Sequence, residues 1–405
     1  MIHVALLGFG VVGSGAAEVL TQNKAVIEKK VGSPVNIKYI LDLREFPNSP
    51  FGNLIVHDFD TIVNDPEVSL IAEMMGGSHP AYDFSLRALR AGKSVVTSNK
   101  EVVANFGTEL LAVAREMGVA YLFEASVGGG IPLIRPLRED LASNNITAIS
   151  GILNGTTNYI LTKMDTEGTA FEDALRDAQA RGYAEANPAA DIEGIDAARK
   201  IVILAAMAFG KRLSPADILC EGITAITAED SERAAKLGYT IKLIGYTTEQ
   251  DGRILAMVSP RLVPLSSPIA GVNGVFNGVL ISADMVGEVM FYGPGAGKLP
   301  TASAVVGDMM DIMSHGATGV HIPAWEDASP ADVADPDAYV CRHMIVLDAT
   351  VEATASITLA FEDCIDRFET TNGRVAFITG LLTEGRVKEM ILSCGYPLIS
   401  RIRVL

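Results

Sequence analysis

Two residues of opposite charge stand four positions apart where a long apolar run begins. Asp196 and Lys200 would share one face of a helix, because residues four apart are neighbours there. The run that follows, residues 201–209, is almost wholly apolar, which indicates burial. A buried charged pair is costly unless it is well compensated or has a function. A catalytic pair and an ordinary Asp–Lys pair capping a core helix are equally compatible with these residues.

A lysine at this place could take part in hydride-transfer chemistry. When an alcohol carbon gives a hydride to a nicotinamide ring, some group must accept the hydroxyl proton and return it in the reverse reaction. A lysine can do both, and its cation stabilises negative charge that develops on oxygen. Glu185, three residues after Gly182, could with Asp196 bind the ammonium and hydroxyl groups of an amino-alcohol substrate.

A G-x-G-x-x-G pattern near the first residue predicts a dinucleotide site. It lies between a strand expected at His3–Leu7 and a helix expected at Ser14–Val31, the context in which the pattern is informative. The first glycine permits a tight turn, the second a close approach to the pyrophosphate, and the third helix–strand packing. A plain strand–turn–helix is the alternative. The candidate cofactor contacts are Gly8, Phe9, Gly10, Val11, Val12 and Gly13.

The end of the second expected strand, Val35–Leu41, carries both an acid and a base. A carboxylate such as Asp42 would accept hydrogen bonds from the ribose hydroxyls of NAD, whereas an arginine such as Arg44 would hold the 2′-phosphate of NADP. The two residues indicate opposite preferences, so both cofactors remain open, and an ordinary charged loop is also compatible.

A second lysine, Lys100, follows the strand expected at Ser94–Thr97. Ligands gather at the carboxyl ends of parallel strands, so Ser98 and Lys100 would lie close to cofactor and substrate. A capped helix with a solvated lysine is the alternative. A glycine-rich loop, residues 124–132, could ring a hard cation with its carbonyl oxygens, although composition alone favours a flexible hinge.

Changes in the expected secondary structure along the chain predict three domains. Strand- and helix-like stretches alternate over residues 1–130, which predicts an α/β Rossmann domain with a parallel sheet. Residues 131–297 mix helices with β-rich segments, as in an α+β catalytic domain. A helix at about 298–320 follows a glycine-rich turn. The acidic, proline-containing segment 324–339 is typical of a linker.

The last part of the chain, residues 340–405, is expected to form a small βαβαβ unit. The strand-like segments are His343–Val351, Val375–Leu382 and Ile399–Leu405, and the helical ones are Thr354–Asp366 and Arg386–Cys394.

Composition narrows the class of protein. A formal charge of −17 repels phosphate backbones, so we expect no nucleic-acid partner. Apolar runs are too short for a membrane span, and no signal peptide is recognisable at the first residues, so no membrane association is expected. The cysteines are scattered, which argues against zinc and disulfides and for a reducing, cytoplasmic compartment: Cys220, Cys341, Cys364 and Cys394.

Several uncommon motifs occur in an order that resembles homoserine dehydrogenase over residues 1 to about 315. They are the glycine pattern at 8–13, Ser98-Asn99-Lys100, the loop 124–132, Gly151-Ile-Leu-Asn-Gly-Thr-Thr-Asn158, Gly182-Tyr-Ala-Glu185, Asp191-Ile-Glu-Gly-Ile-Asp-Ala-Ala-Arg-Lys200 and Tyr292-Gly-Pro-Gly-Ala-Gly297. The resemblance implies the reversible oxidation of L-homoserine to L-aspartate 4-semialdehyde with NAD(P)+, a step toward threonine and methionine.

The resemblance also implies residue roles. Lys200 would be the general acid/base and Lys100 a second catalytic lysine, while Glu185 and Asp196 would hold homoserine. Gly182, Gly295 and Gly297 would approach the cofactor. Backbone carbonyls of a monovalent-cation site, usually for sodium, would come from Glu124, Val127, Gly129 and Ile131. The resemblance also implies assembly through the catalytic sheet, as a homodimer or a homotetramer.

Two departures from the family pattern leave questions open. Many bacterial members have an arginine just before the acid at the second strand, where this chain has Leu41, so NADP preference is not implied. The C-terminal unit is similar to an ACT-type regulatory unit but lacks its acidic-Pro-Gly loop, so threonine feedback is a hypothesis only.

Two other functions fit the sequence less well. Another two-domain NAD(P) reductase, such as an aspartate-semialdehyde dehydrogenase, would need a cysteine nucleophile in a catalytic loop, and none is recognisable. A nucleotide-binding redox sensor would not need both Lys100 and Lys200.

Overall fold

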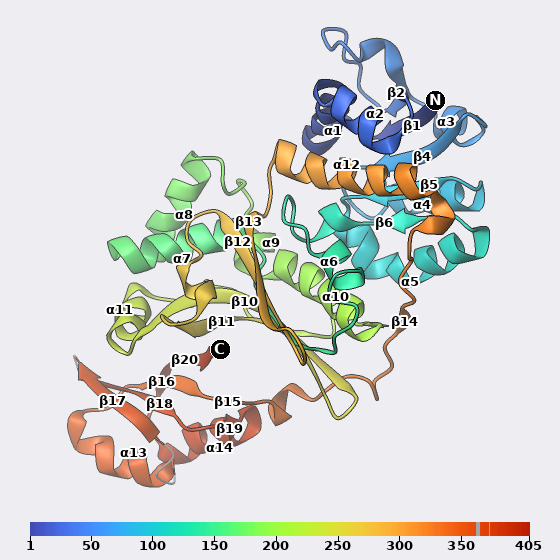
Figure 1. Ribbon diagram of the computed structural model, residues 1–405. Helices are drawn as coiled ribbons and strands as arrows, with labels where there is room; N and C mark the ends of the chain where they lie inside the picture. The colour runs from blue at the N-terminus through green and yellow to red at the C-terminus, as the bar shows by residue number, and fades with distance from the viewer. Residues whose placement is uncertain (362–364, 372) are drawn as a thin grey trace. The chain divides into compact units, whose positions relative to one another are not determined.

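The computed structural model describes residues 1–361, 365–371 and 373–405 (Figure 1). The chain forms two compact units, each assembled from separate segments. The first unit contains Met1–Thr147, Val202–Asp217 and Ser282–Ala328, and the second contains Ala148–Ile201, Ile218–Ile281 and Ser329–Leu405. No helix in the described ranges is both long enough and apolar enough to cross a membrane.

The first unit is built around a parallel sheet of order β3-β2-β1-β4-β5-β6. All its neighbouring strands pair in parallel, which confirms the expected Rossmann arrangement. The strands are β1 (Ile2–Leu7), β2 (Val35–Leu41), β3 (Ile55–Val56), β4 (Val68–Glu73), β5 (Ser94–Thr97) and β6 (Tyr121–Leu122). The order reverses at β1, which has β2 on one side and β4 on the other; ligands bind at such switch points.

Helices connect these strands. They are α1 (Val11–Gln22), α2 (Lys24–Val31), α3 (Phe59–Val63), α4 (Ala81–Arg90) and α5 (Lys100–Met117). The single helix expected at Ser14–Val31 is in fact two, α1 and α2, which meet at Asn23.

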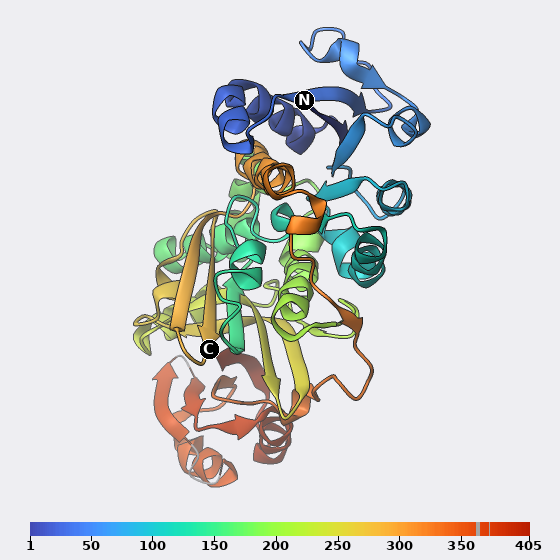
Figure 2. The same cartoon turned by 45° about the vertical axis from the view of Figure 1, so that its right-hand side comes forward.

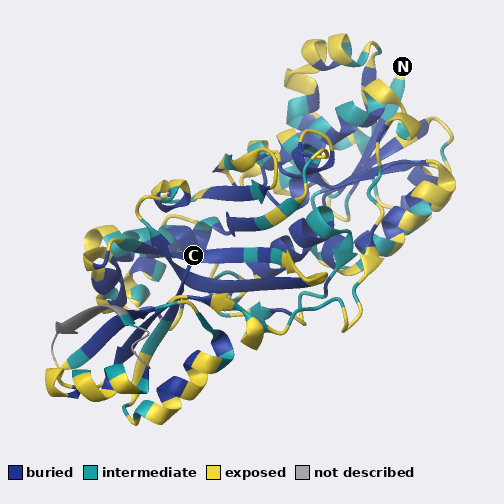
Figure 3. Ribbon diagram, turned by 60° about the horizontal axis from the view of Figure 1, so that its bottom comes forward, coloured by how far each residue is buried: buried dark blue, intermediate teal, exposed yellow. Residues whose placement is uncertain are grey.

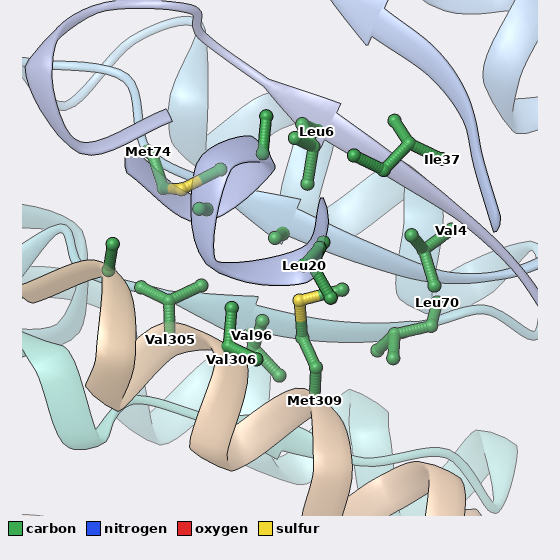
Figure 4. Packing of buried hydrophobic residues seen from close by; sticks show 14 of the residues in the cluster. Val4, Leu6, Leu20, Ile37, Leu70, Met74, Val96, Val305, Val306 and Met309 are labelled. Carbon is green, nitrogen blue, oxygen red and sulfur yellow. The ribbon is translucent and has the colours of Figure 1, made fainter. Parts of the chain in front are cut away.

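A helix from much later in the chain completes the core of the first unit. α12 (Lys298–His315) packs its apolar residues, among them Val305 and Met309, against the sheet residues Leu6 and Leu70 and against Leu20 of α1 (Figure 4). Burial of apolar surface on both partners stabilises this arrangement. The first unit is therefore not one continuous stretch of sequence.

The second sheet is mixed, as expected for an α+β domain, and has the order β13-β12-β7-β10-β11-β20-β16-β18-β17. Its first strands are β7 (Ile146–Ile152), β10 (Tyr239–Gln250), β11 (Arg253–Pro264), β12 (Phe276–Ala283) and β13 (Gly287–Pro294), and the short β9 (Leu219–Cys220) pairs with β11. The associated helices are α6 (Ile134–Arg138), α7 (Gly155–Glu167), α8 (Phe171–Ala180), α9 (Ala189–Ile192), α10 (Ile195–Phe209) and α11 (Ala228–Lys236).

The C-terminal part differs from the expected βαβαβ order. Its elements run β16 (His343–Leu347), α13 (Thr354–Ala360), β17 (Ile365–Thr371), β18 (Arg374–Thr379), α14 (Glu384–Cys394) and β20 (Leu398–Val404). The helix expected to reach Asp366 ends at Ala360, and β17 was missed; residues 362–364, with Cys364, lie outside the described residues. Among the described residues, β17 pairs only with β18 at the edge of the sheet, where a strand need not be apolar on both faces.

Both C-terminal helices cover the same face of these strands (Figure 2). Strands β16 and β18 are mostly buried, whereas the outer surfaces of the helices are exposed (Figure 3). Phe361, Phe377 and Val387 contribute to the apolar core between the two layers.

The segment expected to be a free linker is partly fixed. Trp325 is buried, and its ring centroid lies 5.3 Å from that of Phe123. The next two residues form β14 (Glu326–Asp327), which pairs with β8 (Lys211–Arg212). An aromatic side chain in an acidic segment was the indication that this stretch packs on the protein.

Candidate active site

The glycine pattern forms the expected turn between β1 and α1. Gly8 has a φ of +88°, and a Cβ there would lie 2.9 Å from the carbonyl oxygen of Met74. A Cβ on Gly13 would lie 1.9 Å from the carbonyl oxygen of Gly8, so the third glycine is required for packing. A Cβ on Gly10 would meet nothing within 4 Å. No neighbouring protein atom therefore requires a glycine at position 10. The open space beside Gly10 agrees with a ligand that approaches the backbone closely.

A cavity of about 480 Å³ opens beside this turn. Its lining comes from the carboxyl ends of β1, β2, β3 and β4, from the loops that follow them and from the first turn of α4: Gly8, Gly10, Leu41, Asp42, Leu43, Arg44, His57, Met74, Met75, Gly76, Pro80 and Phe84. The cavity thus lies at the switch point of the sheet, where a dinucleotide binds in this class of fold.

Asp42 and Arg44 line this cavity and bind each other. The guanidinium donates from Nε to Oδ1 and from its terminal nitrogen to Oδ2, both at 2.9 Å. Oδ2 also accepts from the backbone N–H of Phe9 at 2.8 Å. The Arg44 guanidinium holds the pKa of Asp42 well below its usual range, so the carboxylate stays ionised. His57 approaches the carbonyl oxygen of Asp42 at 2.7 Å.

Lys100 is the first residue of α5, three positions after Thr97, the last residue of β5. Asn99 caps this helix, because its Oδ1 accepts from the N–H groups of Glu101 and Val102, both at 3.2 Å. The Asn99 amide donates to the carbonyl oxygen of Gly77 at 2.8 Å. Asn99 therefore caps the helix, as the alternative interpretation of this segment expects. The cap also places Lys100 at the carboxyl edge of the parallel sheet, the edge at which the glycine turn lies.

A buried glutamate beneath this edge was not foreseen. Glu73 ends β4 and is fully buried. Its Oε2 accepts from the Thr97 hydroxyl at 2.5 Å and its Oε1 from the N–H of Met75 at 2.7 Å. Burial raises the pKa of Glu73 to about 7. The indication in the sequence was an acidic residue closing an apolar strand.

Asp196 and Lys200 lie on one face of α10, as expected, and both are buried. The Lys200 Nζ lies 2.9 Å from Asp196 Oδ2 and donates to the carbonyl oxygen of Leu153 at 2.7 Å. The Asn154 amide nitrogen donates to Asp196 Oδ2 at 2.9 Å and to Asp191 Oδ1 at 2.7 Å. Because Asn154 also caps α7, the β7–α7 junction fixes the charged pair.

Gly182 and Glu185 lie just after α8. Gly182 has a φ of +76°, and its N–H donates to the carbonyl oxygen of Gln179, as at a helix end. The hydroxyl of Thr156 donates to the carbonyl oxygen of Tyr183 at 2.6 Å, which ties this turn to α7. Glu185 itself is exposed.

The glycine-rich loop after β6 is buried rather than hinge-like. The Glu124 carboxylate accepts from the N–H groups of Leu133, Ile134 and Arg135 at 2.6, 2.9 and 2.7 Å, and so caps α6. Gly129 has a φ of +57°, and a Cβ there would lie 2.4 Å from the carbonyl oxygen of Gly295. The expected cation loop and one of the expected cofactor loops are therefore in contact.

The predicted residues are divided between the two units. The first unit holds the glycine turn with Phe9, Val11 and Val12, and also Asp42, Arg44, Ser98, Lys100, Glu124, Val127, Gly129, Ile131, Gly295 and Gly297. The second holds Gly182, Glu185, Asp196 and Lys200. Asn154, Asp191 and Glu73 were not predicted as site residues; Asn154 belongs to one of the motifs, but its partners are distant in sequence.

These features define a class. A glycine turn at the switch point of a parallel sheet binds a dinucleotide, and a buried lysine held by a carboxylate can exchange protons. Such a protein is a nicotinamide-dependent oxidoreductase.

Comparison with known proteins identifies the family. The model of the homoserine dehydrogenase NAD-binding domain matches residues 8–124, and that of homoserine dehydrogenase itself matches residues 132–310. Homoserine dehydrogenase of Synechocystis is 44% identical over 319 residues, which are 77% of this chain and 73% of that protein. The chain belongs to the homoserine dehydrogenase family.

Solved structures agree. A homoserine dehydrogenase from Thiobacillus denitrificans matches with a TM-score of 0.91 and 38% identity, covering 100% of this chain and 98% of that one. A hyperthermophilic archaeal homoserine dehydrogenase mutant in complex with NADPH matches with a TM-score of 0.66 and 29% identity, covering 76% and 97%.

Proposed function

We propose residue roles for a chain whose activity is that of an NAD(P)-dependent homoserine dehydrogenase. Lys200 takes the hydroxyl proton of L-homoserine as the carbon is oxidised, and returns it when L-aspartate 4-semialdehyde is reduced. The observation that carries this role is the buried Lys200 Nζ, held by Asp196 at 2.9 Å and by the Leu153 carbonyl at 2.7 Å. Bound NAD(P)+ supplies the hydride acceptor.

The neighbouring residues have supporting roles. Asp196 compensates the ammonium form of Lys200, and Asn154 keeps Asp196 in place. With Glu185, Asp196 binds the amino-alcohol substrate. Lys100, at the carboxyl edge of the nucleotide sheet, stabilises negative charge near the nicotinamide.

The test is the Lys200→Ala variant, followed by nicotinamide absorbance at 340 nm. We expect kcat to fall by about 100-fold or more while NAD(P)+ still binds. Lys163→Ala is the matched control, because Lys163 also lies beside a carboxylate, 3.1 Å from Asp177, but on a different helix. Normal turnover by Lys200→Ala would refute the assignment.

We also propose how this chain tells its cofactors apart. With NAD+, the ribose hydroxyls hydrogen-bond Asp42 in the arrangement seen here. With NADP+, the 2′-phosphate replaces Asp42 as the partner of Arg44. The paired side chains at the cavity support both modes, and the preference follows from how much the loss of the Asp42–Arg44 pair costs.

A monovalent cation fits the loop after β6. Val127, Gly129 and Ile131 are buried, and within the described ranges no hydrogen bond ends on their carbonyl oxygens. Buried carbonyl oxygens normally have partners, and oxygen ligands suit a hard cation. We therefore propose that these oxygens, with that of Glu124, hold Na+. Loss of activity on replacing Na+ by a large organic cation, and recovery on its return, is the test.

The remaining proposals concern the roles of the domains, the oligomeric state and feedback regulation. Residues 1–130 with the helix near 298–320 bind the nucleotide, and 131–297 bind substrate and dimerise. The βαββαβ order of the C-terminal part supports an ACT-like unit, for which threonine is the candidate effector. Light scattering tests the dimer or tetramer. A rate and melting temperature unchanged by millimolar threonine would exclude feedback by this amino acid.

A further inference from the structure

A buried arginine on the last strand, β20, forms an ion pair with Glu221, the residue that follows β9. Arg403 of β20 is only 2% exposed. Its two terminal nitrogens donate to the two carboxylate oxygens of Glu221 at 2.5 and 3.1 Å. β20 pairs in parallel with β11, with Arg403 opposite Arg261. A bidentate arginine–carboxylate pair fixes both partners in orientation as well as distance.

A second carboxylate holds the other side of this guanidinium. Glu384 of α14 accepts from Arg403 at 2.6 Å on one oxygen and at 3.1 Å on the other, and from Arg401 at 2.9 Å. His343 Nε2 lies 2.7 Å from the same carboxylate. Cys341, His343 and Glu384 lie close together and could ligate a metal by residue type. The two guanidinium groups already occupy the carboxylate, so the cluster anchors Arg403 instead.

Glu221 lies on the segment that packs against the start of the catalytic helix. Its N–H donates to Val258 of β11 at 2.8 Å. A Cβ on the next residue, Gly222, would lie 2.2 Å from the carbonyl oxygen of Ile192, so the two backbones are in direct contact. The N–H of Ile223 donates to that same carbonyl at 2.8 Å.

This contact lies two residues from the first turn of α10. Ile192 ends α9, which carries Asp191, a partner of Asn154. The carbonyl oxygen of Gly194 accepts from Ala198 at 2.8 Å and so starts α10, which carries Asp196 and Lys200. Displacement of residues 221–223 would therefore move the α9–α10 turn, on which the separation of Asp191 and Asp196 depends.

We propose that Arg403 and Glu221 are positioning residues for the reaction. The pair holds residues 221–223 against the α9–α10 turn and thereby sets the place of the Asp196–Lys200 pair. This inference rests on the proposed role of Lys200. All the contacts belong to the second unit, so nucleotide binding in the first unit is a separate readout.

The test uses Glu221→Gln, Arg403→Lys and the double variant in the full chain, with kcat, both KM values and thermal unfolding. We expect each single variant to lower kcat by about three- to tenfold, because small misplacements of reacting groups are costly, with the KM for NAD(P)+ unchanged. The double variant should be no worse than the poorer single variant, since the two residues act as one pair.

The matched control is Arg374→Gln. Arg374 of β18 also joins the C-terminal part to the rest of the second unit, through Glu229, but Glu229 lies on α11 and not beside the α9–α10 turn. This variant should keep its kcat even if its melting temperature falls equally. The inference would be overturned if Glu221→Gln and Arg403→Lys kept a normal kcat. It would also be overturned if their kcat fell no further than that of an equally destabilised Arg374→Gln. If Lys200→Ala is inactive in that case, the proposed function stands.

Discussion

Asn154 donates to Asp196 and to Asp191 from a single amide nitrogen, at 2.9 and 2.7 Å. These two carboxylates lie on different helices, 42 and 37 positions after Asn154 in the sequence. The amide of Asn154 brings them together in space. Lys200 compensates Asp196 from the other side. The Asp196–Lys200 pair is thus held by the junction of β7 and α7 as well as by its own helix.

Replacing Asp196 by Asn should reduce both activity and stability. The buried Lys200 would lose its compensating charge, and breaking a buried ion pair costs about 3–5 kcal/mol. We expect kcat to fall by about 100-fold, measured by steady-state absorbance, and the denaturant midpoint to decrease. Asp177→Asn, beside the more exposed Lys163, should leave kcat unchanged. Equal effects in the two variants would argue against a special role for Asp196.

Arg44→Ala should discriminate between the cofactors. The change removes the expected partner of a 2′-phosphate but leaves the Asp42 carboxylate to accept ribose hydroxyls. The KM for NADP+ should rise by about tenfold or more relative to that for NAD+, in parallel titrations. An equal change in both KM values would show that Arg44 does not contact the phosphate.

Glu73 should make stability depend on pH. Its pKa is raised by burial from an ordinary 4.5 to about 7 in the folded chain. Its contribution is therefore fully present below pH 4.5 and is lost as the pH rises through 7, an effect on the order of 3 kcal/mol. Melting curves of the native chain and of Glu73→Gln should diverge over this range. A constant difference between them would mean that Glu73 is ionised throughout.

Gly129→Ala should impair cation and cofactor binding together. The added Cβ would lie 2.4 Å from the carbonyl oxygen of Gly295, so both loops must shift. We expect a weaker response of the rate to Na+ and a higher KM for NAD(P)+. Gly168→Ala is a suitable control, because it also has a positive φ, +65°, but meets nothing within 4 Å. A matching loss in the control would indicate backbone strain alone.

Local patterns predicted the elements whose partners are near in sequence or whose strands are wholly apolar. The glycine turn and the Asp196–Lys200 pair follow from spacings of two to four residues. Partners that meet only through the fold were not predicted. Glu221 and Arg403 are 182 positions apart, and nothing near either residue indicates the other. The polar edge strand β17 was missed for a related reason, because its sheet partner, not its sequence, decides its structure.

The measurement that tests the role of Lys200 most directly is chemical rescue of Lys200→Ala. NADPH or NADH formation from homoserine at 340 nm would be followed with and without ethylamine, a small amine that can occupy the truncated space. We expect activity to be nearly lost without the amine and to recover with rising amine concentration. High activity of Lys200→Ala without amine would contradict the proposal that this ammonium group exchanges the proton.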